Sequence, residues 1–323
     1  MLRLKELTTW LIAGLFLAAC SSHAAATRAS TGAVFATASF TVASRLSPKP
    51  TLTQSFTLQP SATFTPGFTS LPSATFTPLP SLTPTELTCW QEGGRMELGQ
   101  LETSLLRQPL DFRVYLPPCY AQQPERRYPV LYLIHGQSYS DDQWDRLGAD
   151  EIADRLIATS QAAPFLIVMP RDREWSQADV DPFGQAVIEA LIPHIDQAYR
   201  TLPEREQRAV GGLSRGASWA IHFGLKYWQL FGAFGAHSPP VFWSDVPQVK
   251  KWLEAIPREA MPRIFLDIGK NDRPEIMESA IWFEKLLTQR SIPHVWYLFG
   301  GYHEEAYWQA HLEQYLRWYT AEW

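Results

Sequence analysis

The stretch Arg208-Ala-Val-Gly-Gly-Leu-Ser-Arg-Gly-Ala217 decides the interpretation of this chain. Its first six residues are typical of a short buried strand, and residues 217–227 have helical spacing. Between them, Gly212-Leu-Ser-Arg-Gly216 is a G-x-S-x-G motif, which places a serine on a sharp strand-to-helix turn. The motif predicts Ser214 as a nucleophile. The alternative is that Ser214 only caps the helix that follows it.

Strand and helix patterns alternate on both sides of this motif. Alternation predicts a half-exposed edge strand at 111–117, and apolar runs predict strands at 129–135, 164–170, 231–236, 262–269 and 294–299. Helical spacing occurs at 150–160, 183–199, 276–289 and 304–320. This alternation predicts an α/β fold with a mostly parallel sheet covered by helices on both faces. Ligands of such sheets bind beyond the carboxyl ends of the strands.

A serine hydroxyl needs a base, and the base needs an acid to orient it. Asp272 follows strand 262–269 in a loop at its carboxyl end, where the acid of a Ser, acid, His order belongs. Asp267 lies inside the strand and ranks second, and Glu275 ranks third. Asp272 has an alternative role as the cap of the helix that begins near residue 276.

His303 is the expected general base. It lies between the last predicted strand and the last predicted helix, in the Gly-containing loop Gly300-Gly-Tyr-His-Glu304. His294 opens a strand at the wrong end of the sheet, and His311 lies within a helix. The other histidines considered are expected to shape a loop or to pack in the interior: His135, His222 and His237.

Two further groups of residues are expected around the serine. The oxyanion hole requires two backbone N–H groups, for which we expect those of Arg215 and Gln137. Trp144, Trp175 and Trp243 fall in predicted loops after strands, where they would form an aromatic cleft for a sugar or a phenolic acyl group. The alternative is that these tryptophans cover the hydrophobic core.

Residues 95–320 resemble the putative esterase family of α/β hydrolases, which includes esterase D, feruloyl esterases, enterochelin esterase and the mycolyltransferases. The resemblance is carried by residues 128–136 with Trp144 downstream, residues 191–201, the motif at 212–216, Asp272, and His303 before Trp308. It implies an α/β-hydrolase fold and an acyl-enzyme on Ser214. The familiar motif of the family is G-x-S-M-G-G, whereas Arg215 and Ala217 stand here in place of Met and the second Gly. The role of Arg215 is left open by this pattern.

The first 88 residues differ in composition from the rest. Residues 1–20 have a positive start, an apolar run and the ending Leu17-Ala-Ala-Cys20, which resembles a lipobox with Cys20 as the lipidated residue. The alternative is a signal peptide cut near Ala24–Ala26 and a secreted product. Residues 21–88 are rich in Ser, Thr and Pro, which predicts a disordered linker. Residues 89–323 form the expected catalytic domain.

The remaining cysteines and the charge restrict the function. Cys89 and Cys119 are expected to pair in an exported protein, the alternative being two free thiols. No CxxC or H-E-x-x-H pattern predicts a metal, and the mechanism requires no cofactor. A net charge of −5 without a basic patch argues against nucleic acid as a partner.

The sequence thus predicts an extracytoplasmic serine esterase, anchored to a membrane by lipid, that acts on small-molecule or carbohydrate esters. Three alternatives remain open at this point. An acyltransferase would use the same triad with a sugar hydroxyl in place of water. A surface-tethered binding module would be catalytically silent. A prolyl-oligopeptidase-type peptidase would usually carry an additional propeller domain.

Overall fold

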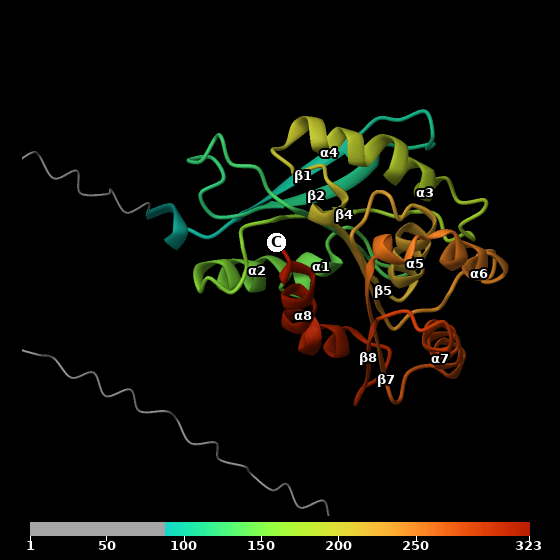
Figure 1. Ribbon diagram of the computed structural model, residues 1–323. Coiled ribbons are helices and arrows are strands. Elements are labelled where there is room, and N and C mark those ends of the chain that lie inside the picture. Colours follow the sequence, from blue (N-terminus) through green and yellow to red (C-terminus); the bar gives the residue numbers. More distant parts are fainter. Residues whose placement is uncertain (1–87) are drawn as a thin grey trace, which may run out of the picture. The chain divides into compact units, whose positions relative to one another are not determined.

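The computed structural model describes residues 88–323, and an eight-stranded sheet forms their centre (Figure 1). The strands are β1 (Arg95–Leu101), β2 (Leu110–Leu116), β3 (Val130–Ile134), β4 (Leu166–Pro170), β5 (Arg208–Leu213), β6 (Ala233–His237), β7 (Arg263–Gly269) and β8 (Val295–Phe299). Their spatial order is β1-β2-β4-β3-β5-β6-β7-β8. β2 runs antiparallel to both neighbours, while the pairs from β4 to β8 are parallel. The predicted mostly parallel sheet is confirmed.

Burial along the sheet explains which strands the sequence revealed. β3, β4, β5 and β6 are buried at every position, as expected of continuous apolar runs covered on both faces. β1 is an edge strand with no buried residue, and its sequence Arg-Met-Glu-Leu-Gly-Gln-Leu gave no apolar run to identify it. The sheet edge at β1 was therefore not predicted.

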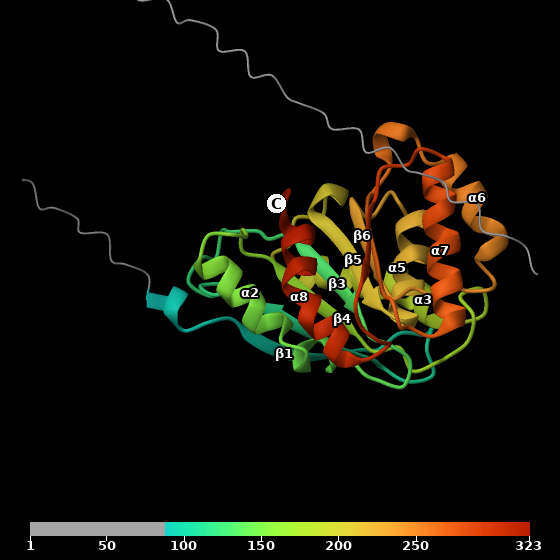
Figure 2. The ribbon, with the colours of Figure 1, turned by 90° about the horizontal axis from the view of Figure 1, so that it is seen from below.

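Helices cover both faces of the sheet (Figure 2). They are α1 (Gln143–Arg146), α2 (Ala149–Ala158), α3 (Pro182–Ala186), α4 (Ile192–Ala198), α5 (Arg215–Lys226), α6 (Val246–Ala255), α7 (Pro274–Gln289) and α8 (Glu305–Thr320). Buried side chains of α1, α2 and α8 form one core cluster, and those of α3 to α7 contribute to the cluster on the other face. α6 was not among the expected helices.

The expected helix at 183–199 is present and contains one wider turn. α3 and α4 are separated by a π-helical turn at Val187–Leu191, and Pro193 is in the first turn of α4. A proline has no N–H, and its ring collides with the carbonyl of the fourth preceding residue in a regular α-helix. The wider turn accommodates this proline, and the predicted helical segment with Val187, Leu191 and Ile195 on its buried face is confirmed.

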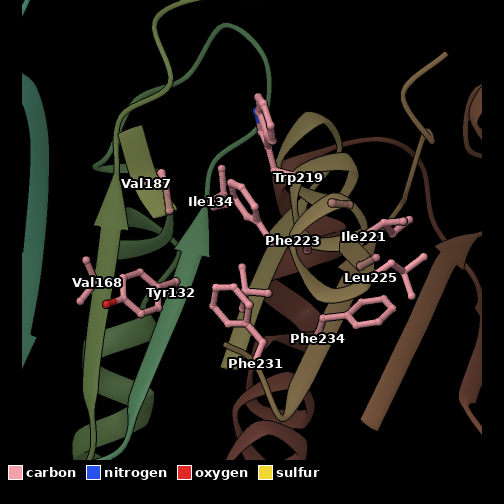
Figure 3. Close-up of a cluster of buried hydrophobic side chains, with 14 of the residues drawn as sticks. Tyr132, Ile134, Val168, Val187, Trp219, Ile221, Phe223, Leu225, Phe231 and Phe234 are labelled. Carbon is pink, nitrogen blue, oxygen red and sulfur yellow. The ribbon is translucent and has the colours of Figure 1, made fainter. Parts of the chain in front are cut away.

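α5 anchors the nucleophile turn in the core. Trp219 and Phe223 of α5 belong to the same buried cluster as Tyr132 and Ile134 of β3 (Figure 3). Gly224 lies directly against the ring of Phe234 on β6, so a larger side chain would push α5 away from the sheet. Burying a large aromatic side chain contributes about 2–3 kcal/mol, which makes the start of α5 a rigid platform.

At the amino-terminal side of the described residues, Cys89 and Cys119 form a disulfide. The predicted pairing of these two cysteines is confirmed. The predicted signal peptide at 1–20, with its lipobox-like ending at Cys20, and all of the predicted 21–88 linker except its last residue lie outside the described residues. Among residues 88–323, the longest helices are too short and too polar to cross a bilayer.

Candidate active site

The nucleophile turn joins β5 to α5 and holds Ser214 in an unusual backbone conformation. Its φ of 52° and ψ of −121° lie in a region that side-chain-bearing residues rarely adopt. The flanking glycines permit this turn: a Cβ atom at Gly212 would collide with the backbone of Gly216, and one at Gly216 would collide with the carbonyl of Ile134. Ser214 N–H donates to His237 O at 2.8 Å, which pins the turn to β6.

Ser214, His303 and Asp272 are brought together in the order that the sequence predicted. His303 Nε2 lies 2.8 Å from Ser214 Oγ, and His303 Nδ1 lies 2.9 and 3.1 Å from the two carboxylate oxygens of Asp272. A carboxylate only accepts, so Nδ1 carries the proton and Nε2 is free to accept the serine proton. Ser214 occupies the N-cap position of α5 but its side chain makes no cap hydrogen bond, and the N-cap of α7 is Arg273 and not Asp272.

Hydrogen bonds between two loops set the distance between the acid and the base. Lys270 N–H donates to Phe299 O at 2.7 Å, and Asn271 N–H donates to Gly301 O at 2.9 Å. Gly301 has a φ of 142°, and a Cβ atom at Gly269 would collide with its carbonyl. The loop after β7, with Asp272, and the loop after β8, with His303, are thereby held against each other.

Asp267, the second candidate acid, has a different environment. Its carboxylate accepts hydrogen bonds from Tyr307 and Tyr315 at 2.6 and 2.7 Å, and it lies 2.7 Å from His237 Nδ1. Burial raises the pKa of both tyrosines, so their hydroxyls remain donors. Asp267 therefore belongs to a polar cluster within the core, and its carboxylate has no hydrogen bond to His303. Glu275, the third candidate, is exposed near the start of α7.

The two expected oxyanion donors are unpaired in the described part of the chain. Neither Arg215 N–H nor Gln137 N–H has a hydrogen-bond acceptor among residues 88–323. A Cβ atom built on Gly136 would lie 3.6 Å from Ser214 Cβ, so the chain just before Gln137 lies next to the nucleophile. Two free N–H groups near the serine are what an oxyanion hole requires.

Gln143 is a site residue that the sequence analysis missed. It is fully buried, accepts from Gly136 N–H at 2.8 Å, and donates to Glu305 at 3.0 Å. It connects the loop after β3 to the start of α8, two residues beyond His303. Its position seven residues after Gly136 gave no signal, because the contact forms through the turn at α1.

The three tryptophans predicted to form a cleft differ in their exposure to solvent. Trp144 is 1% exposed, donates from Nε1 to Ile134 O at 3.0 Å, and packs edge-on against His237. Its expected role in the substrate cleft was wrong, because α1 turns its indole into the core. Trp175 and Trp243 are 56% and 82% exposed, in the loops after β4 and β6.

Exposed aromatic side chains occur in four loops at the carboxyl ends of the strands. Besides Trp175 and Trp243, these loops carry Tyr139 after β3 and Tyr302 after β8, and Tyr302 immediately precedes His303. Both tyrosines are site candidates that were not predicted, although each follows a predicted strand in the sequence as the tryptophans do.

Residues 88–323 contain no group of three or more His, Cys, Asp or Glu side chains arranged to hold a metal ion. The site described above brings together a serine hydroxyl, an imidazole, a carboxylate and two free N–H groups.

Comparison with known proteins agrees with this geometry. Residues 103–319 match the family described as "Putative esterase". The bifunctional endo-1,4-beta-xylanase/feruloyl esterase of Xylanibacter ruminicola is 28% identical over 207 residues, which cover 61% of this chain and 26% of that protein. A Mycobacterium tuberculosis esterase is 31% identical over 156 residues, covering 45% of this chain and 32% of the relative. The chain thus spans about a quarter to a third of the length of these relatives.

Solved structures share the fold. A ferulic acid esterase superposes with a TM-score of 0.63 at 24% identity, covering 71% of this chain and 98% of that chain. The feruloyl esterase module from Clostridium thermocellum complexed with sinapinate gives a TM-score of 0.59 at 18% identity, covering 72% and 89%. By its family match and its fold, this chain belongs to the "Putative esterase" family and has the α/β-hydrolase fold.

Proposed function

We propose that the chain hydrolyses carboxylic esters through an acyl-enzyme on Ser214. The observation that carries this proposal is the continuous contact from Ser214 Oγ to His303 Nε2 and from His303 Nδ1 to Asp272, with separations of 2.8 and 2.9 Å. These distances are within the range for a nucleophile bonded to its base and a base bonded to its acid.

In the proposed reaction, Ser214 Oγ attacks the ester carbonyl while His303 Nε2 takes the hydroxyl proton. The carbonyl oxygen becomes an oxyanion, which the N–H groups of Arg215 and Gln137 stabilise. The alkoxide leaves with the proton from His303. Water then attacks the acyl-enzyme with His303 as base, which releases the acid and restores Ser214.

The substrate class follows from the exposed aromatic side chains. Flat, partly exposed indoles suit sugars and phenolic rings, which have an apolar face and a polar edge. Arg215 Nη atoms donate to the carbonyls of Glu174 and Ser176, both at 2.8 Å, so Trp175 is held between two anchored residues. Ser244 N–H donates to the Gln177 side chain at 3.3 Å, which connects the Trp243 loop to the Trp175 loop. We therefore propose acyl or feruloyl esters of carbohydrates.

A labelling experiment tests the mechanism. The wild-type domain should react with a fluorophosphonate and hydrolyse p-nitrophenyl acetate, and Ser214→Ala should abolish both. Ser218→Ala is the matched control, since Ser218 lies one turn further along α5. Turnover by Ser214→Ala within tenfold of the wild type would contradict the acyl-enzyme mechanism.

A substrate panel tests the substrate class. Trp175→Ala and Trp243→Ala should raise KM for feruloyl and acetyl-sugar esters more than for p-nitrophenyl acetate. Equal losses on every ester, accompanied by a lower Tm, would mean that these side chains only support the fold. Acyl transfer is measured in the same panel by adding a sugar acceptor and assaying its acylated product.

An exported, lipid-anchored location is proposed from the lipobox that ends at Cys20. Cys20→Ser should abolish labelling of the protein by a fatty-acid analogue in a bacterial host. Unlipidated wild-type protein that is cut after Ala26 would instead indicate secretion.

A further inference from the structure

Arg215 has a buried side chain directly after the nucleophile, and every polar atom of its guanidinium is engaged. Nε donates to Asp172 at 2.7 Å and Nη2 donates to Asp181 at 2.6 Å. Nη1 and Nη2 also donate to the two carbonyls on either side of Trp175. A surface arginine after a nucleophile would be free to contact substrate. This arginine is instead committed to the 172–181 segment.

His135 makes a second connection to the same segment. Its Nδ1 lies 2.7 Å from Gly136 O, and its Nε2 lies 2.9 Å from Asp172 N. A carbonyl only accepts and a backbone N–H only donates, so Nδ1 carries the proton and Nε2 does not. Burial lowers the pKa of His135, which keeps the imidazole neutral.

The contact between His135 and Gly136 O has a geometric consequence for Gln137. Gly136 C=O and Gln137 N–H belong to one planar trans peptide, and they point to opposite sides of it. Fixing the carbonyl with His135 Nδ1–H therefore fixes the direction of the Gln137 N–H. The same bond polarises the peptide, which strengthens that N–H as a donor.

Asp172 forms hydrogen bonds with both His135 and Arg215. Its backbone N–H donates to His135, and its Oδ2 accepts from Arg215 Nε and from Trp219 Nε1 at 2.7 and 2.9 Å. Its other carboxylate oxygen accepts from Glu174 N–H at 3.1 Å. Asp172, in the loop after β4, thus connects two parts of the oxyanion site. One is the loop that carries Gln137, and the other is Arg215, whose backbone N–H is the second free donor.

We infer that Asp172, with His135 and Arg215 on either side of it, is a positioning residue that holds the two oxyanion N–H groups at a fixed separation. This inference rests on the proposed acyl-enzyme function and assigns a role to Arg215, whose place in the motif the familiar G-x-S-M-G-G pattern does not explain. None of the three side chains needs to contact the substrate. Their effect reaches the reaction through the Gln137 and Arg215 peptides.

Three variants test the inference. His135→Phe keeps the ring and removes the bond to Gly136 O. Asp172→Asn keeps the shape of the side chain but replaces one carboxylate oxygen by an NH2 group, which cannot accept a hydrogen bond from Arg215 or Trp219. Arg215→Lys keeps the charge and loses the forked contacts. Each should lower kcat by about 10- to 100-fold with KM within about twofold, because a small displacement of a stabilising group acts on the transition state.

A transition-state analogue separates this role from a merely structural one. An aryl boronic acid forms a tetrahedral adduct on the serine, and its Ki should rise by the same factor as kcat/KM falls. Asp245→Asn is the matched control: Asp245 is also buried and bonds a histidine of α5, His222 at 2.8 Å. It should lower Tm while leaving kcat and Ki unchanged.

Several outcomes would overturn the inference. One is an unchanged kcat and boronate Ki in His135→Phe and Arg215→Lys, whatever happens to Tm. Another is a rise in KM with kcat preserved, which would assign these residues to substrate binding. If Asp172→Asn does not fold, His135→Phe decides alone, since it changes a single oxyanion peptide. If the wild type hydrolyses no ester through Ser214, the proposed function fails and the inference fails with it.

Discussion

Residues 88–323 contain three histidine–aspartate pairs, and two of them, His303–Asp272 and His237–Asp267, differ in whether the imidazole has a reactive neighbour. In the catalytic pair, His303 Nδ1 faces Asp272 and Nε2 faces Ser214. In the core pair, His237 Nδ1 faces Asp267 and Nε2 faces the hydroxyl of Tyr319 at 3.1 Å. The core pair is fully buried, whereas His303 and Ser214 remain partly exposed. A paired imidazole is thus a base for catalysis only when its other nitrogen meets an accessible nucleophile.

The core pair nevertheless supports the catalytic one. The carbonyl of His237 accepts from Ser214 N–H, and Asp267 O accepts from Ser238 N–H at 2.8 Å. Asp267 also binds Tyr307 of α8, the helix that follows His303. The difference in role therefore predicts a difference in response: changes in the catalytic pair should affect turnover, and changes in the core pair should affect stability.

The largest effect is expected from His303→Ala. Loss of the base should reduce kcat by about 10⁶-fold, as removal of a triad histidine does elsewhere, with Tm nearly unchanged because His303 lies in the loop between β8 and α8, outside the sheet and the helices. His237→Phe should lower Tm while its folded fraction keeps kcat within tenfold. The measurements are steady-state ester hydrolysis and thermal unfolding of each variant. A folded His237→Phe protein without activity would break the distinction between the pairs.

Substitutions of the two aspartates should differ in the same way as substitutions of the two histidines. Asp272→Asn should lower kcat by about 10⁴-fold with the fold intact, because the imidazole loses its orientation and tautomer. Asp267→Asn should lower the free energy of unfolding by about 2–4 kcal/mol, since two tyrosines and a histidine lose a charged partner. Urea denaturation and kcat on the same preparations check both statements. If Asp267→Asn is the more damaging to kcat with unfolding unaffected, Asp267 and not Asp272 is the catalytic acid.

A smaller effect is expected from changing the two tyrosines that donate hydrogen bonds to Asp267. Tyr315→Phe should cost about 1–3 kcal/mol of unfolding free energy, the range for a hydrogen bond to a charged group. Tyr307→Phe should cost a similar amount, and the double variant should deviate from additivity because both hydroxyls bind Asp267 Oδ2. Tyr297→Phe on the exposed edge is the control. Strictly additive losses would mean that the two hydroxyls act independently.

The smallest effect concerns pH. Burial, and next the charge of Asp172, raise the pKa of Asp181 to about 6. The folded state therefore holds this proton up to a higher pH than the unfolded state, whose Asp pKa is about 3.9. The contribution of Asp181 to stability declines as pH rises from about 4 to 6. Asp181→Asn should remove that decline, as measured by urea denaturation at pH 4, 5 and 6. An unchanged pH slope would show that Asp181 does not take up this proton.

The order of the catalytic residues was predictable because it follows from topology. Parallel strands end at one edge of the sheet, so Ser214, Asp272 and His303, each placed after a strand, had to meet there. The same reasoning failed for Trp144, since a residue after a strand end can turn inward when a short helix follows. Tyr139 and Tyr302 also follow strand ends, so the same topology argument places them at this edge, but only the structure shows that their side chains are exposed.

The sequence by itself determined the α/β-hydrolase fold, the family and the trio of Ser214, His303 and Asp272, because strand periodicity and the glycine-flanked turn are local properties. Only the tertiary structure decided that Asp267 faces His237, where the Arg215 guanidinium binds, and that Gln143 and Asp172 lie against the oxyanion loop. Those contacts join residues 7 to 43 positions apart. Their partners are chosen by packing and by the need to satisfy buried polar groups, and neither leaves a periodic trace in the chain.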